Sequence, residues 1–190
     1  MNYTYLMKEK LDSELFKHSL GTAKAAAELA KRYDVDSEKV YLAGIVHDYA
    51  KPLSGDELLK KAEQLQVPLD RITRQQHKLL HAPVGAVLLE KELEIRDPDV
   101  LKAVAYHTTG HSKMSNFEKV LYLADYIEEN RQISGVEEIR KAAEKDLELA
   151  LLIALDTAIQ SIVARRLMLH PDSVAFRNSL LKELAGKDKL

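Results

Sequence analysis

The sequence predicts an all-α fold, and three observations lead to that prediction. The 190 residues include only 7 Gly and 5 Pro, few for a chain rich in hairpins, and good helix formers dominate. Helix-capping signals recur from end to end. No convincing alternating strand pattern, fixed-period repeat or low-complexity linker interrupts them. We expect eight or so helices in one helical bundle or orthogonal array.

The first two predicted helices have the clearest patterns. Asp12 can cap a helix that extends to about Arg32, and His18 lies on the apolar stripe of this helix. Asp36 can cap the next helix, which is apolar nearly all round as far as Val46. A helix of that kind is expected to be buried.

Later helices are predicted mainly from their N-terminal residues. Ser54 with Glu57, and Ser115 with Glu118, form capping-box patterns. Asp97-Pro98 is typical of an N-cap followed by proline in the first turn.

The C-terminal third is expected to complete the same domain. A long apolar run predicts a helix over about 145–169, which His170-Pro171 ends, and a last helix covers about 173–184. The breaks near 66–68 and 108–110 are loop-sized rather than domain-sized. Residues 1–190 are therefore interpreted as one domain, with a core of about 12–130 and C-terminal helices of about 135–188.

Composition excludes several classes of protein. The chain has no Cys, which excludes disulfides, thiolate metal sites and a cysteine nucleophile. No segment approaches the roughly 20 apolar residues that cross a bilayer, and the N-terminus has no signal-peptide pattern, so we expect a cytoplasmic protein without a membrane partner. A net charge of −2 gives no general attraction to nucleic acid. An anionic substrate would need local positive charge.

Polar residues at apolar positions indicate where the chemistry lies. The pair His47-Asp48 closes the most apolar helix, where an unpaired carboxylate is costly. His18 lies on an apolar stripe, and Asp125 follows Leu121 by four residues and so shares its inward face. Each residue alone could be a hydrogen-bonded core residue or a cap. Together, on three separate helices, they predict a site of two His and two Asp.

Such a site suits a divalent transition metal. Imidazole and carboxylate ligands without sulfur are compatible with iron, manganese, cobalt or nickel. Zinc prefers a tetrahedral set, which four protein ligands would fill. An octahedral ion with four protein ligands keeps two positions free, one for an activated water and one for a phosphoryl oxygen. This arrangement indicates a metal-dependent phosphohydrolase.

The order His18, His47-Asp48, Asp125 resembles that of the HD-domain metal-dependent phosphohydrolases. Longer segments are more specific and follow in order over nearly the whole chain: IVHDYAK (45–51), LLHAPVGA (79–86), AYHTTGH (105–111), EKVLYLADYIE (118–128) and HPDSVAFRNSLLKEL (170–184). They are similar to the bacterial YqeK-type HD proteins, which resemble symmetrical diadenosine tetraphosphate hydrolases.

The resemblance implies cleavage of diadenosine tetraphosphate into two ADP, with iron as the metal. The matching metal ligands are His18, His47, Asp48 and Asp125. The positions expected to meet the nucleotide phosphates are Lys51, His81, His107 and Arg131, and catalysis is expected from Asp48, Lys51, His81 and His107. The segment expected to line the nucleotide pocket is His170, Pro171, Asp172, Ser173, Val174 and Ala175.

Elementary chemistry agrees with these roles. Symmetrical cleavage requires attack at an inner phosphorus with ADP as the leaving group, and one metal ion cannot neutralise a tetraphosphate. Lys51 follows Asp48 by three residues, and Arg131 could fold back toward Asp125 with the bidentate fork that phosphate prefers. His81, like His107, could donate a proton to phosphate or to the leaving group.

Other interpretations of single residues stay open. Alone, Lys51 would be a solvated lysine, Arg131 a helix C-terminal charge and His81 part of a helix-start turn. His77 is interpreted as a surface residue. We favour one metal ion, but a second is conceivable if Asp48 bridges two ions and the second takes histidine ligands from His81, His107 and His111.

Two other functions remain as alternatives. The first is another HD reaction on a mononucleotide or a guanosine alarmone, and the second is a non-enzymatic nucleotide-sensing module. A role in nucleic-acid binding is disfavoured because no aromatic-basic stripe accompanies the charge of −2. The apolar helix around 151–155 is either core or the face of a homodimer.

Overall fold

The computed structural model describes residues 2–187, and this range contains ten α-helices, one 3₁₀ helix and no strand. The predicted all-α class is confirmed. The elements are α1 (Tyr3–Lys10), α2 (Ser13–Arg32), α3 (Ser37–Val46), α4 (Gly55–Gln64), η1 (His77–Leu80), α5 (His81–Leu93), α6 (Pro98–Tyr106), α7 (Asn116–Ile127), α8 (Val136–Ala143), α9 (Leu147–Ala164) and α10 (Pro171–Ala185).

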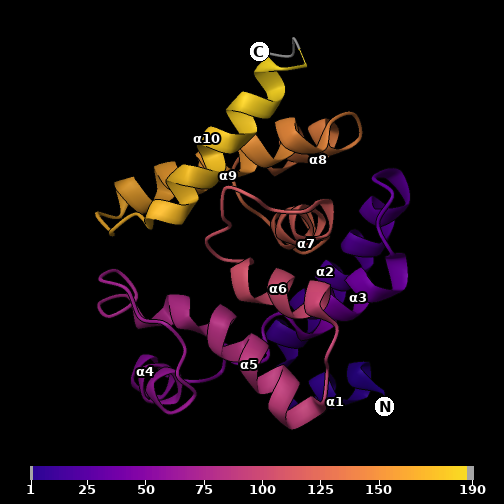
Figure 1. The fold of residues 1–190 in the computed structure, drawn as a ribbon. Coiled ribbons are helices and arrows are strands. Elements are labelled where there is room, and N and C mark those ends of the chain that lie inside the picture. The colour runs from indigo at the N-terminus through magenta and orange to yellow at the C-terminus, as the bar shows by residue number, and fades with distance from the viewer. Residues whose placement is uncertain (1, 188–190) are drawn as a thin grey trace.

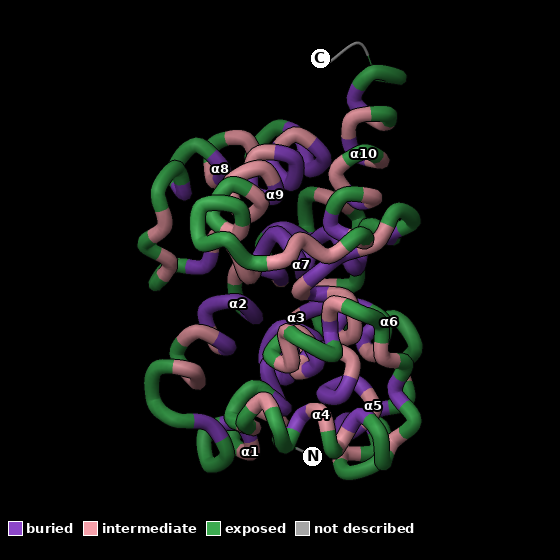
Figure 2. The backbone as a smooth tube through the Cα atoms, turned by 90° about the vertical axis from the view of Figure 1, so that its left-hand side faces the viewer, coloured by how far each residue is buried: buried purple, intermediate pink, exposed green. Residues whose placement is uncertain are grey.

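Helix α7 lies at the centre of the molecule. Figure 1 shows it nearly end on, with α2, α3 and α6 on one side and α8, α9 and α10 on the other. Every residue from Phe117 to Ala124 is buried. Figure 2 shows the same arrangement from the side, with buried backbone along α3 and α7. Asp125 follows this buried run directly, is partly buried, and faces His18 of α2 and His47 after α3.

Small residues bring α2 and α3 unusually close together. A Cβ atom on Gly44 would lie 2.6 Å from the Cα atom of Ala23, so only glycine allows this approach. The close packing places His18 of α2 beside His47, which directly follows α3.

The five helix starts that were predicted from capping residues are confirmed. The side chains of three predicted caps accept backbone N–H groups of their helices, and both capping boxes form. The caps are Asp12, Asp36 and Asp97, and the boxes are Ser54 with Glu57 and Ser115 with Glu118.

The C-terminal boundaries differ from the prediction. Helix α9 ends at Ala164 rather than near 169, because Arg166 takes a left-handed φ of 55°. Helix α10 begins at Pro171 rather than at 173, since the His170 ring accepts the N–H of Asp172 as the N-cap. The end of α9 depends on a backbone turn and the start of α10 on a side-chain cap, and an apolar pattern contains neither.

Three helices, α1, α5 and α8, were not individually predicted. Helix α8 begins after Gly135 without a side-chain cap, so the usual local signal is missing there. Helix α9 is long and apolar enough to cross a membrane by length and composition. Its first half packs against α7, α8 and α10, and Leu151 and Leu155 are buried in the common core. The helix around 151–155 is therefore core rather than a dimer face.

Candidate active site

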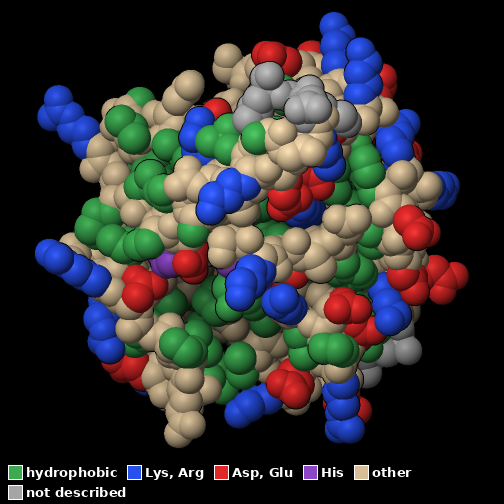
Figure 3. Space-filling view, turned by 45° about the horizontal axis from the view of Figure 1, so that its top comes forward, with side chains coloured by type: hydrophobic (Ala, Val, Ile, Leu, Met, Phe, Trp, Pro, Cys, Tyr) green, Lys and Arg blue, Asp and Glu red, His purple; other side chains and the backbone are tan. Residues whose placement is uncertain are grey.

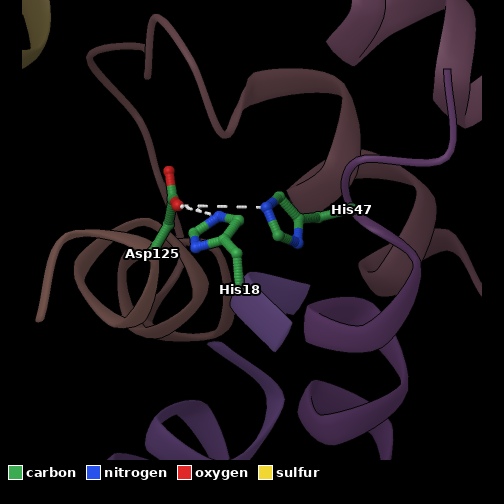
Figure 4. Close-up of side chains that lie close together, drawn as sticks. All are labelled: His18, His47 and Asp125. Carbon is green, nitrogen blue, oxygen red and sulfur yellow. Dashed lines mark ion pairs between the residues drawn. The ribbon is translucent and has the colours of Figure 1, made fainter. Parts of the chain in front are cut away.

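Three side chains from separate parts of the chain converge beside α7. Figure 4 shows the rings of His18 and His47 turned toward the carboxylate of Asp125. The Nε2 atom of His18 lies 2.9 Å from Oδ1 of Asp125, and the Nε2 atom of His47 lies 3.9 Å from the same oxygen. The three ligand atoms are close enough to share one cation.

Asp48 joins this group to a second pair of histidines. Its carboxylate is completely buried, and Oδ2 lies 3.3 Å from Nε2 of His47 and 3.7 Å from Nε2 of His18. Its other oxygen, Oδ1, lies 3.3 Å from Nε2 of His81 and 3.5 Å from Nε2 of His107. The two outer rings are themselves close, with 3.1 Å between their Nε2 atoms. Five helices thus contribute to one compact cluster.

Hydrogen bonds outside the cluster orient all four rings. A carbonyl oxygen can only accept, so a ring nitrogen bound to one must carry the proton. Three rings are held in this way through Nδ1, at 2.5–2.7 Å, by the carbonyl three residues earlier: Gly44 for His47, Lys78 for His81 and Val104 for His107. The Nδ1 atom of His18 instead donates to Oε1 of Glu128 at 3.2 Å. Every neutral ring therefore presents an Nε2 lone pair to the centre.

Several of these inward atoms have no hydrogen-bond partner. Within the described part of the chain, Nε2 of His18, Nε2 of His47 and Oδ1 of Asp48 are buried without one. Buried polar atoms of this kind are rare and costly. A cation between His18, His47 and Asp125 would satisfy the two ring nitrogens, and Asp48 forms a second candidate cation site with His47 and His107. Nitrogen and oxygen donors without sulfur suit a transition metal. The residues present therefore fit a metal ion.

The charges of the cluster reinforce one another. Burial alone would raise the pKa of Asp48, but the neighbouring rings of His47, His107 and His81 hold it well below its usual range. Burial is likewise outweighed at Asp125, whose pKa is lowered by His18, His47 and Arg131. Both carboxylates stay ionised at neutral pH, as metal ligands must.

Two cationic side chains flank the carboxylates. The Nζ atom of Lys51 lies 2.8 Å from Oδ2 of Asp48, and its side chain is 42% exposed. Arg131 donates through Nη2 to Oδ1 of Asp125 at 2.7 Å and through Nε to the backbone carbonyl of Asp125 at 2.8 Å. Arg131 does fold back past the end of α7, as its spacing predicts. The structure thus brings both residues to the predicted metal ligands.

Comparison with known proteins identifies the family. Residues 15–130 match the family model of the HD domain. The chain belongs to the HD domain family. The predicted resemblance is confirmed.

Two relatives and one solved structure are similar to this HD protein over nearly their whole length. It is 39% identical over 183 residues to the symmetrical bis(5'-nucleosyl)-tetraphosphatase of Halalkalibacterium halodurans, covering 94% of this chain and 95% of that one. It is 37% identical to the protein of the same name from Bacillus subtilis, over 92% and 94% of the two chains. A solved structure from Clostridium acetobutylicum, described as a predicted HD superfamily hydrolase involved in NAD metabolism, has 39% identity and a TM-score of 0.92 over 95% and 96% of the two chains.

Two hollows lie near the cluster of this HD protein, and only the smaller one is lined by residues of the cluster or its flanking cations. A cavity of about 280 Å³ is bordered by His18 and Arg131. A larger, mainly apolar groove of about 650 Å³ lies between the loop 65–73, α5 and α6, and Thr108 and His170 are among its lining residues. Figure 3 shows histidine side chains recessed on one face, with acidic and hydrophobic side chains around them.

The segment 170–175 reaches the cluster only indirectly. The hydroxyl of Ser173 donates to the carbonyl of Thr109 at 3.0 Å, two residues after His107. His170 pairs with Asp70 at 2.9 Å, and Pro171 and Val174 are exposed. Asp70 is a neighbour that sequence reasoning did not single out.

Two other histidines lie outside the cluster. His111 donates through Nε2 to Oε1 of Glu118 at 2.7 Å, and the left-handed φ of Gly110 separates it from α6, which ends at Tyr106. His77 is partly buried and binds the carbonyl of Arg74. Glu128 was missed entirely. Its only signal is its place three residues after Asp125, in a segment already quoted for the resemblance.

Proposed function

We propose that this HD protein is a metal-dependent hydrolase that cleaves diadenosine tetraphosphate symmetrically into two ADP, a bis(5'-nucleosyl)-tetraphosphatase. One observation carries the proposal: buried ligand atoms without partners in the described part of the chain converge beside two cationic side chains, Lys51 and Arg131. A cation and a polyanion complete such a site. The names of the relatives, which match over nearly the full chain, support the dinucleotide as substrate.

The metal would be held by His18, His47, Asp48 and Asp125. We favour one ion. A mixed imidazole and carboxylate set is compatible with iron, manganese, cobalt or nickel, and we propose iron because the resemblance to the tetraphosphate hydrolases implies it. When bound, such an ion supplies Lewis acidity at a phosphoryl oxygen and lowers the pKa of water. The remaining groups can then act on the substrate.

Lys51 and Arg131 are assigned to the phosphate chain. Lys51 pairs with Asp48, and Arg131 pairs with Asp125. A bound metal would neutralise both carboxylates. Each cationic side chain could then move to a phosphate of the substrate without leaving a carboxylate unpaired. Arg131 offers two N–H groups in one plane, the geometry that orients a phosphate, while Lys51 acts as a mobile point charge. These charges stabilise the transition state of in-line attack.

His81 and His107 are assigned to proton transfer. Burial and the neighbouring His107 lower the pKa of His81, although Asp48 opposes them. Binding of the negatively charged substrate would favour protonation of this ring. Because its pKa is otherwise lowered, the ring then gives up the proton readily. With their Nε2 atoms 3.1 Å apart, the two rings can hold one proton between them and deliver it to the departing ADP.

The nucleoside is assigned to the start of α10. The groove that His170 and Asp172 border has the size and the apolar lining usual for ligand pockets. We therefore propose that residues 170–175, with Ser173 tied to the loop after His107, hold one nucleotide of the substrate and its ADP product. We place the reaction in the cytoplasm, where nucleotides are made, and leave a homodimer as a separate proposal for measurement in solution.

The decisive experiment is product analysis. The protein is purified anaerobically, its metal content is measured, and products from diadenosine tetraphosphate are separated for the wild type, Asp48→Ala and the exposed control Asp56→Ala. We expect two ADP per substrate, a loss of about 10³-fold or more in Asp48→Ala, the scale of one preorganised electrostatic group, and no change in the control. NAD is tested beside it, because the similar C. acetobutylicum protein is described as involved in NAD metabolism.

Other outcomes would contradict the proposal. AMP plus ATP would move the attack away from the central phosphates and remove the argument for Lys51 and Arg131. Phosphate released from mononucleotides or guanosine alarmones, with the dinucleotide untouched, would favour another HD reaction. Bound metal without turnover of any nucleotide would favour a sensing module.

A further inference from the structure

We infer that Glu128 is a positioning residue for the metal site, which fixes the ring of His18 as a ligand, and that Gly21 is required because it leaves room for this carboxylate. The inference rests on the proposed function only in taking His18 as a metal ligand. It concerns metal retention and is independent of the substrate.

His18 is held differently from the other histidines of the cluster. The Nδ1 atoms of the other three rings bind a carbonyl three residues earlier, which the helical backbone itself holds in place. His18 lies inside α2, where carbonyls are used by the helix, and its Nδ1 binds Glu128, which is 110 residues away. Its orientation therefore depends on a side chain that must itself be fixed.

The carboxylate of Glu128 is firmly fixed. The side chain is 2% exposed, and its second oxygen, Oε2, accepts the backbone N–H of Asn130 at 2.7 Å and the side-chain amide of Asn130 at 3.0 Å. The Nη2 atom of Arg140 donates to the backbone carbonyl of Glu128 at 2.7 Å. The two carboxylate oxygens thus have separate tasks, with Oε1 reserved for His18.

Gly21 makes this arrangement sterically possible. It lies three residues after His18 on α2, and a Cβ atom there would overlap Oε2 of Glu128 and lie 3.3 Å from the side-chain nitrogen of Asn130. Because this carboxylate is buried and hydrogen-bonded, it cannot move out of the way without a loss of stability. Any side chain at this position would push Glu128 away from the His18 ring.

The hydrogen-bond partner of Nδ1 determines how strongly the His18 ring can bind a metal. An ionised carboxylate accepts the Nδ1 proton, keeps the lone pair on Nε2 and makes the imidazole a stronger ligand. Glu128 caps the same helix, α7, that carries Asp125. One helix end therefore supplies a metal ligand and the group that orients another ligand.

The test measures metal affinity without substrate. Metal-depleted wild type, Glu128→Gln, Gly21→Ala and the double variant are titrated with Fe²⁺ under anaerobic conditions and, separately, with Co²⁺, against a competing chelator. Each single variant should bind about 10- to 100-fold more weakly, the usual effect of losing such an outer partner. The double variant should be no weaker than the worse single variant, because both changes break one contact. Glu129→Gln removes the same charge from a side chain that is 67% exposed, and should bind metal like the wild type.

Thermal unfolding of the metal-free variants separates ligand positioning from loss of the fold. Unchanged metal affinity in folded Glu128→Gln would overturn the inference, as would additive effects in the double variant. If Glu128→Gln does not fold, Gly21→Ala decides the matter alone, and wild-type affinity there rejects the inference. Asp48→Ala is titrated alongside. If that variant kept full metal affinity, the metal site itself would be wrong, which is a separate failure.

Discussion

The helices that carry the His and Asp cluster differ from the C-terminal helices in how their buried polar groups are paired. In the first region, α2 to α7, buried atoms of His18, His47 and Asp48 have no hydrogen-bond partner within the described residues. In the second region, α8 to α10, the polar groups at the contact with α7 are paired. Lys119 of α7 lies 3.1 Å from Glu148 and 2.6 Å from Glu183.

This difference indicates that the first region is arranged for ligand binding and the second for stability of the fold. Polar atoms left without partners store an affinity for a ligand at the cost of stability, whereas paired ones at a helix contact favour one arrangement of the fold. The C-terminal layer also attaches through Phe176, which is fully buried and meets Tyr122 edge to face at 5.3 Å between ring centres. Changes in this layer should therefore lower stability while the metal site survives.

The largest expected effect on stability is that of Phe176→Ala. Removing a buried aromatic ring leaves a cavity and should lower the free energy of unfolding by about 3–5 kcal/mol. Urea unfolding measures the loss, and Val174→Ala, at a position that is 39% exposed, serves as a control with little change. Metal content should stay at the wild-type level. A parallel loss of metal from still-folded protein would break the comparison, since the layer would then support the metal ligands directly.

A smaller loss is expected for Lys119→Met. Removing the cation of a buried ion pair leaves Glu148 and Glu183 with less compensation and should cost about 3 kcal/mol, near the lower end for such changes. The value is low because Glu148 keeps Lys187 at 2.7 Å. Thermal or urea unfolding measures it, with the exposed Lys24→Met as the matched control. Equal effects of the two substitutions would show that the buried network contributes nothing special.

The smallest effect is expected for Glu118→Gln, at the capping box of α7. Burial opposes ionisation, but hydrogen bonds from Ser115 and His111 lower the pKa of Glu118 below the ordinary 4.5. A carboxyl with a lowered pKa stabilises the fold above the unfolded value, and this stability is lost as pH falls through the folded value. The variant should be about 1 kcal/mol less stable at pH 7, and the difference should shrink below pH 4.5.

Urea unfolding across that pH range tests the sign. Glu57→Gln, in the same motif on the exposed helix α4, should have a smaller effect. A difference between wild type and Glu118→Gln that grew toward acid pH would contradict the assignment of an ionised, hydrogen-bonded carboxylate.

Local features of the fold could be predicted from the sequence because their causes are local. A capping residue acts within three residues of itself, so the starts of α2, α3, α4, α6 and α7 follow from the chain alone. The same holds for the positions of His18, His47-Asp48 and Asp125 on apolar helix faces, which predicted a shared site. Where a cap is missing, as at α8, or a backbone turn intervenes, as at Arg166, the prediction failed.

Tertiary structure decided how the site is built. Three ring orientations come from carbonyls at helix ends, but that of His18 comes from Glu128, which is 110 residues away and has no periodic signal. The same applies to Gly21. From the sequence it is only a residue of low helix propensity, and its role becomes clear only where α2 packs against the end of α7. Residue types and spacing determine which groups can bind a metal. The packing of helices determines which lone pairs face it, because orientation depends on distant atoms that fill the remaining space.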